Sequence, residues 1–144
     1  MKKRLLCVLI CVTFLCPLAF TQQKYTQGPI WRVELIRVKP GQMDNYLVFL
    51  QTVTKPLLEA QKQQHQIVDY KCLLKQTKSS PQDWDVELAV EYKDFATLDN
   101  FAERHDALRE QLFKGNEKAQ ELIGKMQDMR EILSADLLEE IDLK

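Results

Sequence analysis

Glu34, Glu87 and His105 are the residues of this sequence that could transfer protons. Each carboxylate lies in a run in which apolar and polar residues alternate, which is the pattern of a half-buried strand. If the two strands lie side by side, a partly dry environment raises the pKa of one of the two carboxyl groups. Such a pair can move protons or hold a cationic ligand. Glu34, Glu87 and His105 are therefore the catalytic candidates.

Charged residues on the same strands form a candidate ligand-binding set. The alternation predicts a dry sheet face that packs on helices, made of Trp31, Val33, Leu35, Val68, Tyr70, Leu74, Val86, Leu88 and Val90. The polar face is then expected to hold the ligand-binding candidates Arg32, Glu34, Lys71, Glu87 and Glu91, together with Asp69. Cross-strand ion pairs or a solvated surface would give the same pattern, and structural ion pairs are commoner than sites.

His105 lies on the apolar stripe of a predicted helix. There it could act as an acid or base, or as a ligand to haem iron, and the alternative is a buried, hydrogen-bonded core histidine. His65 follows a glutamine-rich run and is expected to be exposed. No metal site is expected, because the two histidines and Cys72 have no zinc-site spacing. No cofactor is expected either, and haem at His105 stays open as an alternative.

The periodicity of the chain predicts the order strand, helix, strand, strand, helix, helix, strand. Pro56 interrupts the first helix, so we expect a kink there or two helical pieces joined at Lys55. The last ten residues fit either a strand or a continued helix, and a strand from 136 is favoured because it protects a sheet edge. The predicted elements span 31–38, 46–60, 68–74, 84–92, 98–112, 116–133 and 136–143.

The composition and the first residues predict an exported, single-domain protein. The chain has 144 residues, of which 45% are hydrophobic and 28% charged, as in one globular domain. Three basic residues precede an apolar run at 5–15, which predicts a signal peptide over 1–21, a flexible leader over 22–29 and a domain over 30–144. The protein is expected to be periplasmic or secreted, with no stable membrane anchor after cleavage.

The net charge argues against a nucleic-acid-binding protein, and the cysteine content argues against a fold held by disulfides. Removing 1–21 takes away three of the 20 basic residues and none of the 21 acidic ones, which leaves a net charge near −4 and no expected nucleic-acid partner. The same cleavage leaves Cys72 as the one cysteine, so no intrachain disulfide is expected. Cys72 is predicted to be a small buried core thiol.

The element order is the ferredoxin-like βαββαβ plan with an extra helix before the last strand. The run VELIRVKPG at 33–41, followed by Asp44 and Tyr46, and the run VEYKDFATL at 90–98 resemble the dimeric α/β-barrel superfamily. This superfamily includes antibiotic-biosynthesis-monooxygenase-like domains, and the most similar members are exported proteins without an assigned function. The resemblance covers roughly 30–143. It implies an α+β fold with a four-stranded antiparallel sheet, and a homodimer in which two sheets close a barrel.

The resemblance does not select a chemistry, because the superfamily ranges over cofactor-free oxygenases, haem enzymes and binding modules. No short motif of these enzymes can be carried over to this sequence. We expect an exported small-molecule-binding protein that dimerises through its sheet face and holds its ligand in or beside the barrel. One alternative is a cofactor-independent monooxygenase or isomerase-like enzyme. A second is a protein-interaction module without a ligand.

Overall fold

The computed structural model describes residues 24–144. The predicted signal peptide at 1–21 lies outside the described residues. The elements are β1 (Tyr25–Val38), α1 (Met43–Phe49), the π-helical segment η1 (Leu50–Thr54), α2 (Lys55–Gln63), β2 (Asp69–Leu74), β3 (Val86–Tyr92), the 3-10 helix η2 (Phe95–Leu98), α3 (Phe101–Phe113), α4 (Asn116–Met129) and β4 (Arg130–Leu143).

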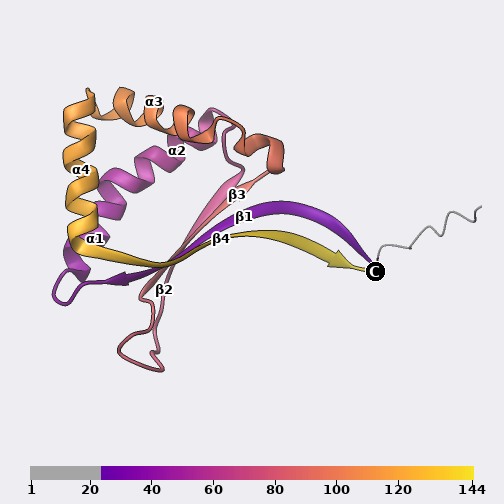
Figure 1. The fold of residues 1–144 in the computed structure, drawn as a ribbon, viewed down its shortest axis with the longest axis horizontal. Helices are drawn as coiled ribbons and strands as arrows, with labels where there is room; N and C mark the ends of the chain where they lie inside the picture. Colours follow the sequence, from indigo (N-terminus) through magenta and orange to yellow (C-terminus); the bar gives the residue numbers. More distant parts are fainter. Residues whose placement is uncertain (1–23) are drawn as a thin grey trace, which may run out of the picture.

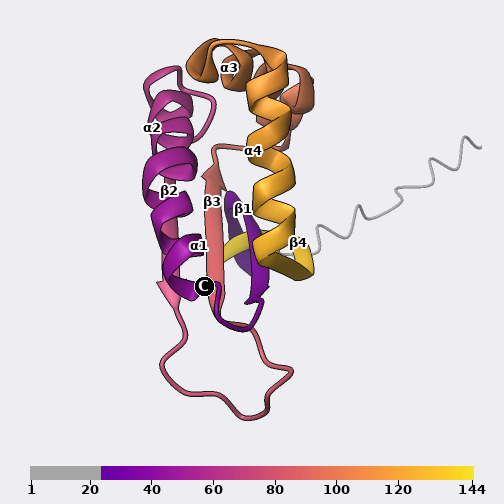
Figure 2. The same ribbon diagram turned by 90° about the vertical axis from the view of Figure 1, so that its left-hand side faces the viewer.

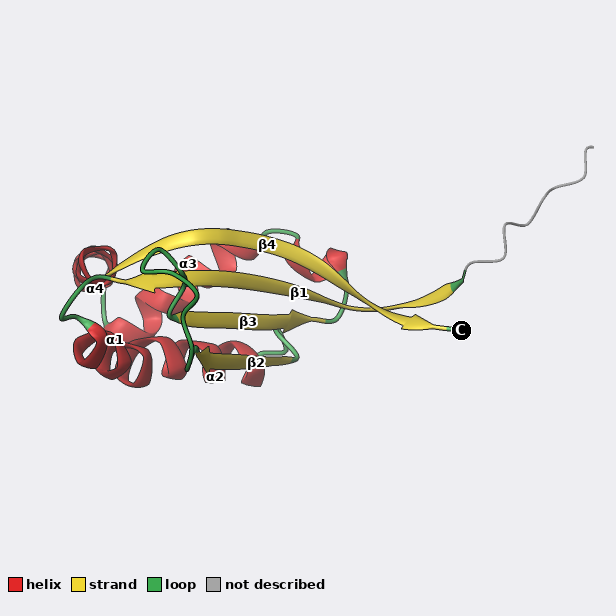
Figure 3. Ribbon diagram, turned by 90° about the horizontal axis from the view of Figure 1, so that it is seen from below, coloured by secondary structure: helices red, strands yellow, loops and turns green. Residues whose placement is uncertain are grey.

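The four strands form one antiparallel sheet in the order β2-β3-β1-β4. The helices of the described chain lie together on one face of this sheet, as Figures 1 and 2 show. Seen from below in Figure 3, the opposite face of the sheet lies in front of the helices. The predicted α+β, ferredoxin-like architecture is therefore confirmed.

The strand pairing decides which side chains the helices cover. Glu34 pairs with Leu88 and Leu35 pairs with Glu87, and paired residues share a face. The covered face carries Ile30, Arg32, Glu34, Ile36, Val86, Leu88, Val90 and Tyr92. The open face carries Trp31, Val33, Leu35, Lys71, Leu73, Glu87, Ala89, Glu91 and Leu138.

The predicted orientation of the first strand is wrong. Trp31, Val33 and Leu35 were expected to face the helices, but they lie on the open face, while Ile36 is fully buried and Glu34 only 8% exposed. Both sides of β1 carry apolar residues, so alternation shows a strand without showing which side the helices cover. The orientation predicted for 86–90 is confirmed.

The strands β1 and β4 are longer than predicted. They continue past β3 as a two-stranded ribbon, visible in Figures 1 and 3. Residues 25–29 are therefore strand, and the predicted flexible leader is wrong there, because Tyr25 pairs with Leu143. Gly28 lies at a bulge in this ribbon, where a Cβ atom would come 3.0 Å from the Glu140 carbonyl oxygen. The predicted final strand is confirmed, but it begins at Arg130 because pairing with β1 starts there.

The first helical region contains the irregularity that Pro56 predicts. Proline has no N–H to donate, and its ring crowds the carbonyl four residues earlier. The chain responds with η1, in which the Lys55 N–H donates to the Leu50 carbonyl five residues back. Beyond this segment Leu58 and Gln61 are buried, whereas Ala60 is only partly buried.

The core consists of two clusters beneath the helices. One is built on Ile30 and Tyr92 and the other on Ile36 and Val86, while Leu88 packs against both. Cys72 lies outside them. The prediction of a buried thiol is wrong, because β2 is an edge strand and its residues 71–74 are exposed.

Candidate functional site

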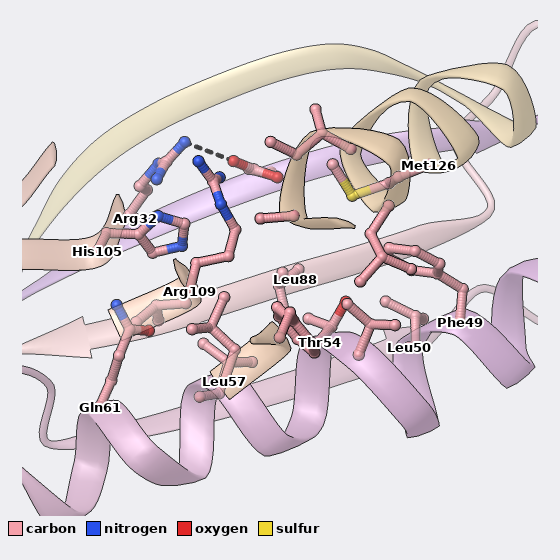
Figure 4. A pocket seen from close by; sticks show the side chains of 18 of the residues that line it. Arg32, Phe49, Leu50, Thr54, Leu57, Gln61, Leu88, His105, Arg109 and Met126 are labelled. Atoms are coloured by element: carbon pink, nitrogen blue, oxygen red, sulfur yellow. Dashed lines mark hydrogen bonds and ion pairs between the residues drawn. The ribbon is translucent and has the colours of Figure 1, made fainter. Parts of the chain in front are cut away.

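A cavity of about 220 Å³ lies between the covered face of the sheet and the helices. Its walls come from β1, β3, the end of α1, η1, α2, α3, α4 and the start of β4, so it is formed within one chain (Figure 4). The sequence predicted a ligand chamber between two sheets of a dimer. The structure instead places Arg32, Glu34 and His105 in this intrachain cavity.

One end of the cavity is apolar. Figure 4 shows Phe49, Leu50 and Met126 at this end, with Leu57 and Leu88 near the middle. The wall at Leu50 belongs to η1, and π-helical turns inside α-helices occur frequently at functional sites. This apolar lining can contact the apolar part of a small ligand without leaving a buried polar group unpaired.

Glu34 is held between two arginines. Its Oε1 accepts from Arg32 Nη2 at 2.6 Å, and its Oε2 lies 3.5 Å from Arg130 Nη1. The same Arg130 nitrogen donates to the Tyr46 hydroxyl at 3.1 Å. Because the Glu34 side chain is 11% exposed and paired on both oxygens, it fixes the two guanidinium groups in the cavity wall.

His105 and Arg109 lie one turn apart on α3, and both line the cavity. Burial lowers the pKa of His105, and the nearby Arg109 charge lowers it further, although Asp106 acts in the opposite direction. The imidazole is therefore neutral at pH 7. Arg109 Nη2 donates to Asp106 Oδ1 at 2.8 Å, and the Asp106 side chain is 64% exposed.

Two buried donors in the cavity wall have no hydrogen-bond partner within the described residues. They are Gln61 Nε2 and Arg109 Nε. Figure 4 shows the side chains of Arg32, Gln61, His105 and Arg109 gathered at one end of the cavity, which we call the polar end.

Sequence reasoning missed three of the polar residues in the wall. Gln61 belongs to the glutamine-rich run before His65 and lies outside the helix predicted over 46–60, and Arg109 and Arg130 were not among the candidates. A signal was present for the first two, because Gln61 is four residues after Leu57 and Arg109 is four residues after His105. Residues at this spacing share one side of a helix.

The remaining candidate residues lie on the open face. Glu87 pairs with Leu35, and Glu91 is aligned with Trp31 and Asp69. The predicted proximity of Glu34 to Glu87 is wrong, since successive strand residues point to opposite faces and Glu34 is paired with Leu88.

Lys71 also lies on the open face, where its Nζ is 4.9 Å from the centre of the Trp31 ring. The structure therefore brings Arg32, Glu34 and His105 together and separates them from Lys71, Glu87 and Glu91.

Among residues 24–144, no cluster of three or more His, Cys, Asp or Glu side chains could hold a metal ion. A cavity of about 220 Å³ is below the ~300–1,000 Å³ typical of drug-sized ligands. No helix in the described part of the chain is long and apolar enough to cross a membrane.

No family model matches this chain. No curated protein matches it. Similar solved structures include HapK from Hahella chejuensis, which is 15% identical with a TM-score of 0.51, over 77% of this chain and 91% of HapK.

Two further similar structures are a dimeric protein of unknown function and ferredoxin-like fold from Bacteroides fragilis NCTC 9343 and a NIPSNAP family protein with unknown function from Agrobacterium tumefaciens str. C58. The first is 14% identical, with 81% of this chain and 98% of that chain covered and a TM-score of 0.46. The second is 16% identical, with 81% and 90% covered and a TM-score of 0.49. At 15% identity, the likeness to HapK is one of fold and not of chemistry.

Proposed function

We propose that this protein binds a small, mainly apolar molecule in the cavity between its sheet and its helices. The observation that carries the proposal is a cavity with one apolar end and one polar end that holds buried donors without partners. Ligand sites are typically apolar concavities with a few polar groups that fix the orientation of the ligand.

We also propose that the chain is exported, as residues 1–21 predict. Determining the N-terminus of the secreted protein tests this proposal.

The test is a thermal-shift screen of small amphipathic molecules, followed by a variant that fills the cavity. Val53→Trp places an indole in the cavity wall and is expected to abolish the ligand-induced shift. Val48→Trp, on the exposed side of the same helical region, is the matched control and should retain it. Equal shifts in both variants would place the ligand elsewhere. A protein-interaction module without a ligand would give no shift in the whole screen.

An enzyme of the cofactor-independent oxygenase or isomerase kind is the second candidate. The neutral imidazole of His105, which lines the same cavity, favours it because a neutral histidine can accept a proton. Mass spectrometry of the bound ligand after incubation tests this candidate. The enzyme hypothesis expects conversion that is lost in His105→Asn while binding is kept, and an unchanged ligand contradicts it.

We also propose that the protein forms a homodimer through the open face. That face carries partly exposed apolar side chains such as Leu73 and Leu138, and a second copy would cover them. Leu138→Asp is expected to give a monomer in sedimentation velocity. Leu137→Asp is the matched control, because Leu137 is similarly exposed but points to the other side of β4. A monomeric wild-type protein would contradict the proposal.

A further inference from the structure

We propose that the ligand is an amphipathic monocarboxylate whose carboxylate is bound by Arg109 and Gln61 at the polar end of the cavity. This inference rests on the proposed binding function and specifies its ligand class. The apolar part of the molecule then lies toward Phe49, Leu50 and Met126 at the other end.

The buried donors determine the kind of group that is bound. Gln61 is 1% exposed, and its Nε2 has no partner among the described residues. The Nε of Arg109 is also buried and has no partner among the described residues. Burying a donor without a partner destabilises the fold, and an arginine nitrogen can only donate. The bound group must therefore be a hydrogen-bond acceptor.

The charges near this acceptor favour an anion. Three guanidinium groups line the cavity, those of Arg32, Arg109 and Arg130. Two carboxylates pair with them, Glu34 in the cavity wall and the exposed Asp106. Because His105 is neutral at pH 7, one positive charge is left without a counterion. A single carboxylate neutralises it, whereas a dianion would leave an excess negative charge in a largely apolar site.

Arg109 is the residue best placed to receive this anion. Arg32 and Arg130 share the buried carboxylate of Glu34, which holds both guanidinium groups in place, whereas the partner of Arg109 is the exposed Asp106 and the Arg109 Nε has no partner among the described residues. An exposed carboxylate in water binds its partner weakly compared with a desolvated one. Arg109 is therefore able to bind a carboxylate on its inner side through Nε while Nη2 keeps its contact with Asp106.

The test is isothermal titration calorimetry with unbranched carboxylates from butanoate to dodecanoate, and with alcohols and amines of the same lengths. The best carboxylate is expected to bind at least about tenfold more tightly than its matched alcohol. Raising the salt from about 0.05 M to about 0.5 M should change this ratio little, because a buried charge pair is screened less than an exposed one.

Variants locate the carboxylate. Arg109→Met is expected to lower carboxylate affinity about tenfold and to leave alcohol affinity unchanged. Arg37→Met is the matched control, since it removes the same charge from the far end of β1, where Arg37 pairs with Glu131. If Arg109→Met fails to fold, Gln61→Met takes its place, with the same selective loss expected.

The outcomes separate this inference from the proposed function. Equal affinity for carboxylate and alcohol, or a preference for the amine, overturns the carboxylate inference and leaves the cavity as a binding site. Binding of no compound in the three series overturns both. A carboxylate preference that survives Arg109→Met and Gln61→Met overturns the assignment of the anion to the polar end.

Discussion

The two faces of the sheet carry similar residue types but differ in burial. On the covered face Ile30 is 1% exposed and Ile36 is not exposed at all. On the open face Leu73 is 49% and Leu138 51% exposed. Both faces also carry charged residues. The difference shows that the pairing register and the placement of the helices decide burial, and that charged residues in a strand do not mark its solvent side.

The largest expected difference between the faces is in side-chain packing. Ile36→Ala removes fully buried methyl groups and is expected to lower the free energy of unfolding by about 2–5 kcal/mol. Leu35→Ala, the adjacent residue on the open face, should cost about 1 kcal/mol or less in the monomer. Urea unfolding at low protein concentration measures both. Equal losses would mean that the open face is buried within the single chain.

The second difference concerns the two glutamates. Glu34→Gln removes a buried charge that pairs with Arg32 and Arg130, and it should lower the free energy of unfolding by about 1–3 kcal/mol. Glu87→Gln on the open face is expected to change it by less than about 0.5 kcal/mol. Urea unfolding curves measure both variants. A lower midpoint for Glu34→Gln, with the slope of the transition unchanged, would establish that it loses more stability than Glu87→Gln. A larger loss for Glu87→Gln would contradict the assignment of the two faces.

The third prediction compares a cavity histidine with an exposed one. Because burial lowers the folded-state pKa of His105, the unfolded chain takes up the proton first as the pH falls. The protein should therefore lose stability below about pH 6.5, the pKa of an unperturbed histidine, and the loss should continue down to the folded-state pKa.

The pH dependence is measured by urea unfolding of matched variants. His105→Asn is expected to show a smaller loss of stability on acidification than the wild-type protein. His65→Asn is the control, because His65 is exposed and asparagine tolerates its positive φ of 55°. A pH profile altered only by His65→Asn would refute the prediction.

The smallest difference between a variant and its matched control is expected at Lys71 on the open face. Lys71→Met removes the cation–π contact with Trp31, which is worth about 0.5–1 kcal/mol at an exposed site. Chemical unfolding followed by tryptophan fluorescence should detect a loss of this size. Lys93→Met, also exposed, serves as the control. A loss of unfolding free energy larger than that of Glu34→Gln would contradict the difference in burial between the two faces.

The sequence predicted the order and type of the elements because their periods are clear, as in the alternation over 84–92. It could not orient β1, since Trp31, Val33 and Leu35 on one side compete with Ile36 and Val38 on the other. The neutralisation of Glu34 by arginines from two strands depends on tertiary contacts that no local pattern contains. Of the polar end, the sequence analysis identified Arg32 and His105 but not Gln61, because a glutamine in a polar run resembles the end of a helix.

The π-helical segment η1 controls which residue of α2 reaches the cavity. An α-helix turns by about 100° per residue, and a turn closed over five residues instead of four delays the following helix by roughly one such step. If 50–54 straightened into a regular α-helix, α2 would rotate on its axis and present Ala60 in place of Gln61. The cavity would lose its amide donor although every residue stayed the same, so the phase of one helix is itself a determinant of ligand choice.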